Sequence, residues 1–370
     1  MKKLGFGMMR LPLLDREDPK SVDMEQVCQM VDTFLSRGFT YFDTAYMYHG
    51  FQSENVVREA LVKRHPRDSF LLASKLPSMF LKEEGDQERI FAEQLEKCGV
   101  DYFDYYLIHN LGTENYAKAE RFGSFAFVSE LKRQGKVRRM GFSFHDTAAV
   151  LDQILTEHPE VDFVQIQLNY LDWESDTIQS RLCHEVCLKH GKQVIVMEPV
   201  KGGTLAKLPG RVTELLSAQH PDWSAPSWAI RFAASCENVF MVLSGMSDMD
   251  QLLDNTSYMA DFAPLTDREN ATLKDAARMI LEDIAVACTS CRYCVDGCPK
   301  KIEIPQYFTL YNRAKQADEA KMKELKASYA ELGRSYGLAS DCISCGQCVR
   351  ACPQHIRIVA ALREVAKTFE

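Results

Sequence analysis

The run Cys-Thr-Ser-Cys-Arg-Tyr-Cys-Val-Asp-Gly-Cys-Pro occupies residues 288–299, and its cysteine spacing recurs in Cys-Ile-Ser-Cys-Gly-Gln-Cys-Val-Arg-Ala-Cys-Pro at residues 342–353. This is the ligand spacing of a [4Fe–4S] cluster: two-residue gaps wrap three thiolates around one cubane, and the fourth cysteine, before proline, often ligates the other cluster. The repeated spacing therefore predicts two clusters. Crossed ligation would give two sets of ligands: Cys288, Cys291, Cys294 with Cys352, and Cys342, Cys345, Cys348 with Cys298.

Zinc and disulfides are the alternative explanations for these cysteines. Zinc takes four ligands, usually as two separated pairs, and disulfides belong to secreted chains. The N-terminal sequence Met1–Gly7 has no apolar block of the kind that a signal peptide needs. The remaining cysteines lie in helical or apolar surroundings and are expected to be buried small hydrophobic residues: Cys28, Cys98, Cys183, Cys187 and Cys236.

The composition indicates a globular protein of a reducing compartment. The chain has 370 residues, is 46% hydrophobic and carries a net charge of −8 without a basic tail, so we expect no nucleic-acid partner. It contains no apolar run of about 18 residues, so we expect no membrane span. Together with the cysteine usage, these features predict a cytoplasmic protein.

Short apolar runs alternate with amphipathic stretches over the first 260 or so residues. The expected strands are 3–7, 40–44, 70–75, 105–109, 139–143, 163–168, 193–197 and 239–244, and the expected helices include 23–37, 53–64, 86–98, 124–134, 177–190 and 225–236. Eight strands separated by helices predict a (β/α)₈ TIM barrel. A doubly wound sheet would need a glycine fingerprint that opens a helix after the first strand, and the stretch Leu4–Arg10 is not one.

The predicted domains are a barrel over residues 1–264, a linker helix over 265–285 and a small helical ferredoxin-like domain over 286–370 that carries both cysteine runs. The stretch 302–329 between the runs has a helical period and is rich in Lys, Glu and Ala. This insert separates the two runs more widely than in a compact bacterial ferredoxin.

Four ionisable residues fall at or just after the ends of three successive predicted strands, where the active site of such a barrel lies. They are Asp43, Tyr48, Lys75 and His109. Each alone has an ordinary explanation, such as a turn cap for the Asp or a solvated Lys. Together they favour a site for carbonyl reduction, in which a phenol gives the proton, a nearby ammonium stabilises the phenolate, and an imidazole orients the carbonyl.

Motifs spread in order over residues 1–260 resemble the aldo-keto reductase family. They are Gly5-Phe6-Gly7-Met8-Met9-Arg10-Leu11-Pro12, Phe42-Asp43-Thr44-Ala45 with Tyr48, Ser53-Glu54, Ser74-Lys75, Leu107-Ile108-His109-Asn110, Leu131-Lys132-Arg133-Gln134-Gly135-Lys136-Val137-Arg138, Gly141-Phe142-Ser143, Gln167-x-Asn169-Tyr170, Glu198-Pro199-Val200-x-Gly202-Gly203, and Ser244-Gly245 with Gln251 and Asn255. With the cysteine runs added, the chain resembles the members of that family that carry a C-terminal two-[4Fe–4S] ferredoxin-like domain.

The resemblance implies a catalytic tetrad of Tyr48, Lys75, His109 and Asp43, and NAD(P)H bound in an extended form without a glycine-rich loop. The implied nucleotide contacts are Ser143, Gln167, Pro199, Val200, Gly203, Gly245, Gln251 and Asn255.

Three departures from the family pattern affect the nucleotide. Phe144 follows Ser143 where the family usually has Asn, and Met197 stands where an aromatic residue usually stacks on the nicotinamide. Ser247 and Asp248 occupy the stretch where a basic residue usually contacts the 2′-phosphate. Because Asp248 would repel that phosphate, NADH is favoured over NADPH.

These observations predict an oxidoreductase that reduces a small carbonyl compound, or oxidises the corresponding alcohol, and carries two [4Fe–4S] clusters. A nicotinamide passes two electrons as hydride whereas a cluster passes one, and a flavin normally bridges the two modes. The alternative is an electron-transfer protein that serves a redox partner, with the barrel as a docking scaffold or flavin holder. The substrate pocket is expected in the loops 79–87, 111–121 and 171–177, with Phe80 and Trp173 as candidate lining residues.

Overall fold

The computed structural model describes every residue except 1, 16 and 316. The chain divides into two compact units. The first unit comprises residues 1–174, 179–199 and 226–266, and the second comprises residues 175–178, 200–225 and 267–370.

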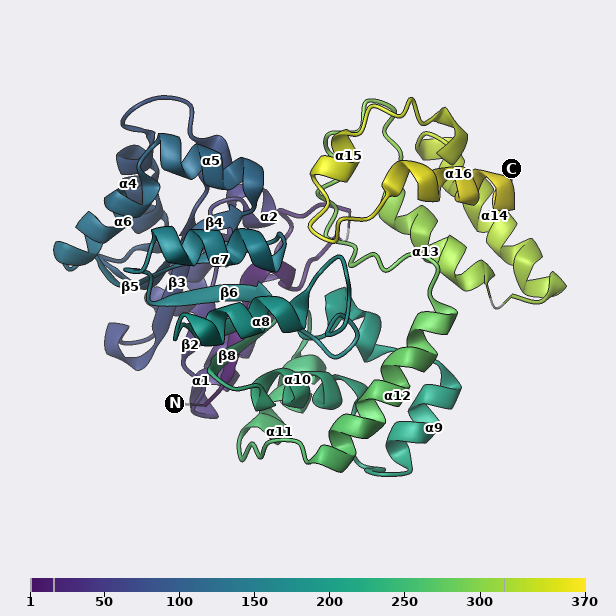
Figure 1. The fold of residues 1–370 in the computed structure, drawn as a ribbon, viewed down its shortest axis with the longest axis horizontal. Coiled ribbons are helices and arrows are strands. Elements are labelled where there is room, and N and C mark those ends of the chain that lie inside the picture. The colour runs from purple at the N-terminus through teal and green to yellow at the C-terminus, as the bar shows by residue number, and fades with distance from the viewer. Residues whose placement is uncertain (1, 16, 316) are drawn as a thin grey trace. The chain divides into compact units, whose positions relative to one another are not determined.

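The first unit contains a closed barrel of eight parallel strands, as predicted (Figure 1). Each strand pairs with the next in sequence, and β1 closes the ring by pairing with β8. The strands are β1 Leu4–Gly7, β2 Tyr41–Asp43, β3 Leu71–Leu76, β4 Phe103–Leu111, β5 Val137–Phe144, β6 Phe163–Gln167, β7 Gln193–Met197 and β8 Val239–Ser244.

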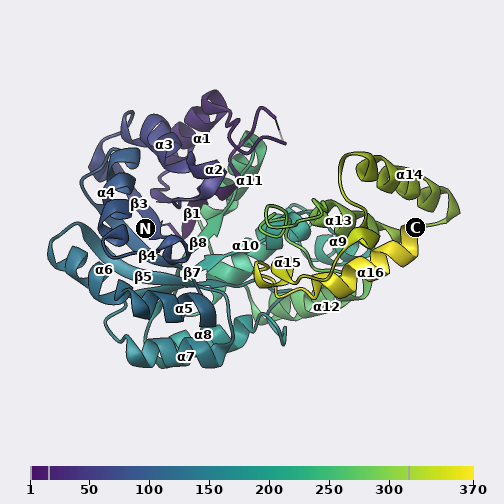
Figure 2. The same ribbon diagram turned by 90° about the horizontal axis from the view of Figure 1, so that it is seen from above.

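Helices surround the strands, and Figure 2 shows α3, α4 and α6 on the outside of the barrel. The helices of this unit are α1 Met24–Ser36, α2 Tyr48–Phe51, α3 Ser53–Val57, α4 Asp86–Cys98, α5 Thr113–Arg121, α6 Ser124–Arg133, α7 Ala148–Glu157, α8 Ser180–Lys189, α10 Ala225–Ser235, whose first residue is counted with the second unit, and α11 Met249–Met259. Among the helices of the described residues, none combines the length and the apolar character that crossing a membrane requires.

Apolar side chains from different strands form one layer of the barrel interior, as is typical of this fold. Tyr41, Leu107 and Met241 are fully buried members of this layer. A Cβ atom at Gly141 of β5 would lie 2.6 Å from the carbonyl oxygen of Phe163. Glycine is therefore required there, because any side chain would collide with the neighbouring strand.

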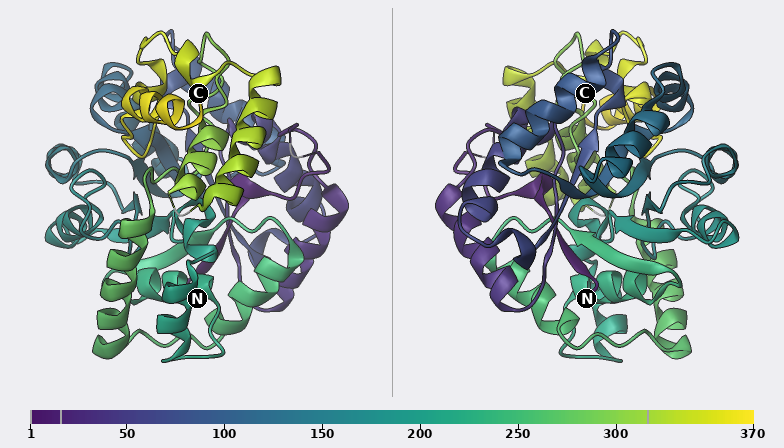
Figure 3. Two further views of the ribbon diagram at one scale, coloured as in Figure 1. Left: turned by 90° about the vertical axis from the view of Figure 1, so that its right-hand side faces the viewer. Right: turned by 90° about the vertical axis from the view of Figure 1, so that its left-hand side faces the viewer.

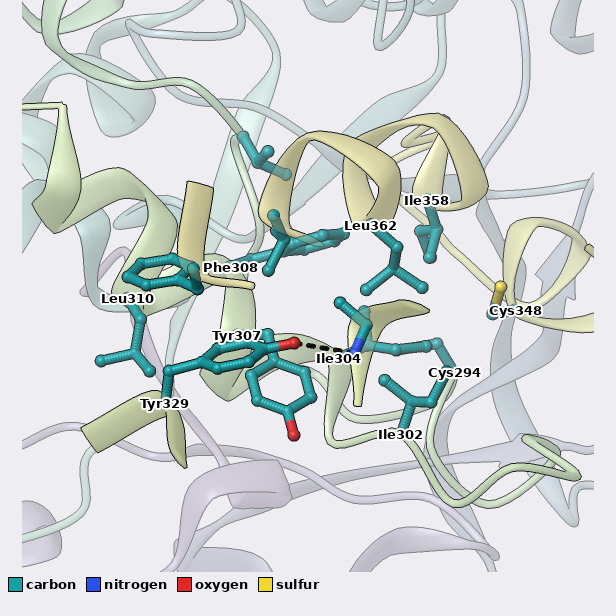
Figure 4. Close-up of a cluster of buried hydrophobic side chains, with 14 of the residues drawn as sticks. Cys294, Ile302, Ile304, Tyr307, Phe308, Leu310, Tyr329, Cys348, Ile358 and Leu362 are labelled. Atoms are coloured by element: carbon teal, nitrogen blue, oxygen red, sulfur yellow. Dashed lines mark hydrogen bonds between the residues drawn. The ribbon is translucent and has the colours of Figure 1, made fainter. Parts of the chain in front are cut away.

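The second unit is helical (Figure 3), and it encloses a core of its own (Figure 4). Its helices are α9 Gly210–Ser217, α12 Asp267–Asp283, α13 Ile304–Ala314, α14 Glu319–Ser335, α15 Gln347–Arg350 and α16 Ile358–Phe369. In this core, Tyr307 stacks on Tyr329 with ring centroids 4.7 Å apart, and Phe308 and Leu362 are buried. Cys294 and Cys348 are buried in the same cluster, so the cysteine runs are integrated into the packing.

The structure refines several predicted elements. Strand β4 continues two residues beyond His109, and the stretch 302–329 forms two helices, α13 and α14. The stretch 111–121, expected to be a loop, is mostly helix α5.

Candidate active site and cluster ligands

The four predicted catalytic residues come together at the carboxyl ends of neighbouring strands. Asp43 ends β2, Tyr48 begins α2, Lys75 lies in β3 and His109 lies in β4. The Lys75 ammonium donates to Asp43 Oδ1 at 2.5 Å and to the carbonyl oxygen of Thr44 at 2.7 Å. It lies 5.1 Å from the centroid of the Tyr48 ring, whose centroid is 6.1 Å from that of His109.

Lys75 and Asp43 form a buried ion pair, with 1% and 2% of their surfaces exposed. Burial raises the pKa of Asp43, and the Lys75 ammonium opposes that rise. Two buried charges are held stably only when each has its partner. The pair therefore fixes the ammonium in the mouth of the barrel.

The acidity of Tyr48 differs from the expected one. Burial raises the pKa of its phenol, and the carboxylates of Asp43 and Glu198 raise it further. The expectation that Lys75 makes this phenol acidic is therefore not met, because burial and the two carboxylates set the direction of the shift. Tyr48 stays protonated, and it can still protonate an alkoxide, which is a stronger base than a phenolate.

His109 is held in its neutral form. Burial lowers the pKa of its imidazole, and the charges of Lys75 and His145 lower it further. Within the described part of the chain, its Nδ1 atom is buried without a hydrogen-bond partner. A neutral imidazole carries one N–H, so His109 can donate one hydrogen bond to a carbonyl oxygen.

A buried polar network lies behind Lys75. Glu54 Oε1 accepts hydrogen bonds from Ser74 Oγ at 2.7 Å and from Gln94 Nε2 at 2.6 Å. The Gln94 amide also donates to the Lys75 carbonyl oxygen at 3.1 Å and accepts from the Tyr106 hydroxyl at 2.6 Å. Burial raises the pKa of Glu54 to about 7. The network connects the end of β3 to helix α4.

Sequence reasoning missed most of this network. The pair Ser53-Glu54 belongs to a motif that resembles the family's, and the sequence indicates no role for Gln94 or Tyr106. The available signal was a charged and an amide side chain, Glu54 and Gln94, on the buried faces of two predicted helices. Their partnership depends on the packing of α3 and α4 against the barrel, which spacing alone does not reveal.

Four cysteines line one cavity in the second unit. These are Cys298, Cys342, Cys345 and Cys348, and apolar side chains such as Leu362 complete the wall. Cys298 comes from the first run and the other three come from the second. The grouping is the one that crossed ligation requires.

The other crossed set is also close together. Burial raises the pKa of the Cys288 thiol to about 11, and the nearby Cys291 and Cys352 add to the rise. The pKa of the Cys294 thiol is also raised, by burial and by the nearby thiols of Cys291, Cys288 and Cys352. The described residues contain no group of three or more His, Cys, Asp or Glu side chains that could hold a metal ion. In a [4Fe–4S] cubane each thiolate binds a different iron atom, so the four sulfur atoms need not converge on one ion. Each of the two sets therefore fits one cluster.

Two family profiles match the chain, one over each of its two parts. The Aldo/keto reductase family profile matches residues 3–278, and a 4Fe-4S dicluster domain profile matches residues 287–356. The chain belongs to the aldo/keto reductase family. A 4Fe-4S dicluster domain is appended to its C-terminal side.

Curated members of the family are distant in sequence. A probable aldo-keto reductase from Glycine max is 28% identical over 50% of this chain, and the match spans only 53% of that protein. An aldo-keto reductase from Mycolicibacterium vanbaalenii is 29% identical over 61% of this chain and 75% of its own length.

Solved structures of the family share the barrel. An aldo-keto reductase from Bacillus halodurans in its holo form has a TM-score of 0.59 at 24% identity, covering 74% of this chain and 91% of its own. A Klebsiella pneumoniae aldo/keto reductase, solved with NADP and acetate, has a TM-score of 0.57 at 19% identity, covering 74% and 90%. At these identities the likeness concerns the fold.

Two positions that resemblance to other aldo/keto reductases assigns to the nicotinamide lie on β5 and β6. The Ser143 hydroxyl accepts the Asn110 amide N–H at 2.7 Å, and Gln167 Nε2 donates to Asp172 Oδ2 at 3.0 Å. Asn169 donates to the same carboxylate oxygen at 2.8 Å. Asp172 was not predicted, yet it orients both amides.

The positions after β8 surround the start of helix α11. Asn255 donates to Ser244 Oγ at 2.9 Å, and the Gln251 side chain accepts from the Ser247 amide at 3.0 Å and donates to Asp248 Oδ2 at 2.7 Å. The Asp248 carboxylate also caps α11. It lines a surface groove together with Asp23, Glu25, Gln26, Gln29, Met249 and Asp250.

The remaining predicted contacts differ in their placement. Gly245 lies close to Arg10, whose Cβ would be 3.1 Å from an added Cβ at that position. Pro199 ends the part of the first unit that follows β7, whereas Val200 and Gly203 belong to the second unit. Gly203 has a φ of 98°, a conformation that favours glycine.

The two aromatic residues proposed to line the substrate pocket pack against other rings. Phe80 lies 5.9 Å from Phe51 and 6.3 Å from Tyr46, measured between ring centroids. Trp173 contacts Phe232 edge-on at 5.4 Å. Trp173 therefore packs against a neighbouring helix residue. Phe80 belongs to an aromatic cluster that includes the exposed Phe51.

Proposed function

We propose that the protein reduces a small carbonyl compound, or oxidises the corresponding alcohol, with a nicotinamide nucleotide. The observation that carries this proposal is the grouping of Tyr48, Lys75, Asp43 and His109 at the carboxyl ends of the strands. That end of a (β/α)₈ barrel is where such enzymes hold their active sites.

Tyr48 is the proton donor in this proposal. The nicotinamide, when bound, supplies the hydride that reduces the carbonyl carbon. The neutral His109 donates a hydrogen bond to the carbonyl oxygen and directs it toward the phenol. As negative charge develops on that oxygen, the Tyr48 proton moves to it, and the raised pKa keeps this proton in place until then.

Lys75 acts on charge rather than as a proton carrier. Its ammonium lies over the Tyr48 ring face, where it lowers the energy of negative charge on the phenol as the proton leaves. Asp43 holds the ammonium at this place. In alcohol oxidation the same residues act in reverse, with the Tyr48 oxygen receiving the proton.

The second unit is proposed to hold two [4Fe–4S] clusters in the crossed sets. Cys288, Cys291, Cys294 and Cys352 hold the first cluster, and Cys298, Cys342, Cys345 and Cys348 hold the second. The cavity lined by the last four cysteines supports this assignment. Such clusters pass single electrons, which makes a redox partner protein part of the proposal.

NADH is proposed as the preferred nucleotide. The acidic groove at the start of α11 supports this, because its carboxylates, Asp248 among them, would repel a 2′-phosphate. Asp248 contacts Gln251, one of the implied nucleotide residues.

Electron transfer is the second candidate function, and one observation favours it. Cys345 is exposed, and Ile343, two residues before it, has 58% of its surface exposed. A cluster held there would lie within reach of another protein. In that case NADH would reduce the clusters without any carbonyl compound.

One anaerobic experiment tests both functions. The purified full-length protein would be analysed for iron and sulfide, and its absorption spectrum recorded before and after NADH, which also reveals any flavin. NADH oxidation would then be followed with 4-nitrobenzaldehyde as the carbonyl probe, in the wild type and in Tyr48→Phe. Turnover lost in Tyr48→Phe supports the reductase. Bleaching of the clusters by NADH without aldehyde, and equal in both proteins, supports electron transfer.

A further inference from the structure

Lys201 lies in the segment that continues the chain after β7, outside the predicted tetrad. This side chain has 1% of its surface exposed, and lysine is rarely buried to this extent. Its ammonium donates to Gln354 Oε1 at 3.2 Å. Gln354 directly follows Cys352-Pro353, the end of the second cysteine run.

The next residue makes an independent contact with the first cysteine run. Gly202 has a φ of 61°, and a Cβ atom there would lie 2.3 Å from the carbonyl oxygen of Thr289. Thr289 follows Cys288 in sequence. The loop backbone thus lies directly against the segment that begins the first run, with no room for a side chain.

The two contacts point to the same cluster. Cys288 and Cys352 belong to different runs, but crossed ligation assigns both to the first cluster. The Lys201 side chain meets the residue two positions after one ligand, and the Gly202 backbone meets the residue next to the other. A buried positive charge is therefore held beside the first set of ligands.

We propose that Lys201 is a tuning residue that raises the reduction potential of the first cluster. Reduction adds one negative charge to a cluster, and nearby charge is one of the factors that set its potential. A charge removed from water acts more strongly than one on the surface, because little solvent screens it. The Lys201 ammonium therefore stabilises the reduced form. This inference rests on the cysteine sets proposed above and not on the carbonyl chemistry.

A purely structural role makes a different prediction. If Lys201 only satisfies Gln354 and fills space, its replacement changes stability or iron content without shifting a potential. Lys201→Met removes the charge and keeps much of the side-chain length, whereas Lys201→Arg keeps the charge. Lys326, exposed on α14 of the same unit, offers the control Lys326→Met with the same change in net charge.

The test is an anaerobic redox titration of the full-length proteins, followed by electron paramagnetic resonance and visible absorption. We expect two midpoint potentials in the wild type, of which one moves to a lower value in Lys201→Met. The potential that moves should be the one that survives in Cys298→Ala, which removes a ligand of the second cluster. Lys201→Arg and Lys326→Met should keep both potentials.

Several results would overturn the proposal. They are unchanged potentials in Lys201→Met, an equal shift of both potentials, or a shift in Lys201→Arg as large as in Lys201→Met. If Lys201→Met loses iron, retention of both clusters by Lys201→Arg supports a requirement for charge, and loss in both variants refutes it. The iron and sulfide contents test the ligand sets separately. A purified protein that contains neither iron nor sulfide would remove the basis of the inference.

Discussion

The ammonium of Lys75 lies over the face of the Tyr48 ring, 5.1 Å from its centroid, while its hydrogen bonds go to Asp43 and the Thr44 carbonyl oxygen. The lysine therefore acts on the phenol through space. Burial is the main cause of the raised pKa of Tyr48, and the carboxylates of Asp43 and Glu198 raise it further. In the proposed site the Tyr48 phenol keeps its proton until an alkoxide forms on the substrate and accepts it.

Removing the Tyr48 hydroxyl tests its role as the acid. Tyr48→Phe should lower kcat for 4-nitrobenzaldehyde reduction by about 10²- to 10⁴-fold, the usual contribution of a positioned acid. Steady-state kinetics measure this. Tyr46→Phe is the matched control, because that hydroxyl bonds Glu93 instead. Comparable losses in the two variants would mean that Tyr48 has no special part in proton transfer.

Breaking the buried ion pair should be costly. Lys75→Met leaves the Asp43 carboxylate buried without its counter-charge, and such losses destabilise by about 3 to 5 kcal/mol. Urea unfolding measures the difference. The double variant Lys75→Met with Asp43→Asn should recover much of the stability but not the activity. Full stability of the single variant would show that the pair is not needed for folding.

Glu54 makes stability depend on pH. Its pKa is about 7 in the folded protein and 4.5 ordinarily, so the unfolded chain releases this proton first as the pH rises. The free energy of unfolding should therefore fall between about pH 4.5 and 7, by at most about 3 kcal/mol, and then level off. Glu54→Gln should remove this contribution, which urea unfolding at pH 5, 6, 7 and 8 would detect.

Glu59→Gln is the control for Glu54, since it lies in the same helical stretch. Its carboxylate bonds Lys63, and that hydrogen bond lowers its pKa. Its contribution is present at neutral pH and is lost as the pH falls. A variant at Glu59 should therefore keep the decline seen in the wild type, and an identical pH profile for Glu54→Gln and wild type would argue against a shifted Glu54.

Nucleotide preference should respond to Asp248. Asp248→Ser removes the carboxylate while keeping a residue that can cap α11. Loss of one nearby negative charge should tighten NADPH binding by about tenfold, with little effect on NADH. Fluorescence titration of both nucleotides gives the two Kd values. The exposed Asp261, changed to Asn, is the control, and equal changes for both nucleotides would contradict the role of Asp248.

Crossed ligation makes a distinct prediction for the fourth cysteine of each run. Cys298→Ala should remove the cluster whose other three ligands come from the second run. Cys352→Ala should remove the cluster whose other three ligands come from the first run. Iron and sulfide contents should fall by about half in each, with different paramagnetic signals left. Cys236→Ala, outside the runs, should retain both clusters. The contrary result is that Cys298→Ala loses the cluster of the first run and Cys352→Ala loses the cluster of the second. Each run would then ligate its own cluster.

Much of the barrel could be predicted because its strands are apolar runs flanked by turns. The bounds of β7 and β8 match the expected ones to the residue. Helix α5 was missed because only Tyr116 and Ala119 are buried along it, too few to give a clear period. The break between α13 and α14 was missed for a related reason, since the residues on both sides favour helix.

The site was predictable where chemistry follows strand ends, and less so where it depends on packing. Asp43, Lys75 and His109 could be located from their strands alone. The support of Lys75 by Gln94, and of Gln167 by Asp172, joins residues through tertiary contacts that no spacing encodes. The pKa of Tyr48 likewise depends on distances, and the sequence led to the opposite direction.

The exposure of Cys345 has a practical consequence for work at the bench. A cubane proposed at Cys345 would have one corner open to dissolved oxygen, whereas the cysteines of the other set are all partly or fully buried. Material purified in air should therefore lose the two proposed clusters in sequence, the one at Cys345 first. Partial iron content in such a preparation would then report damage at one known place rather than a mixture of folds.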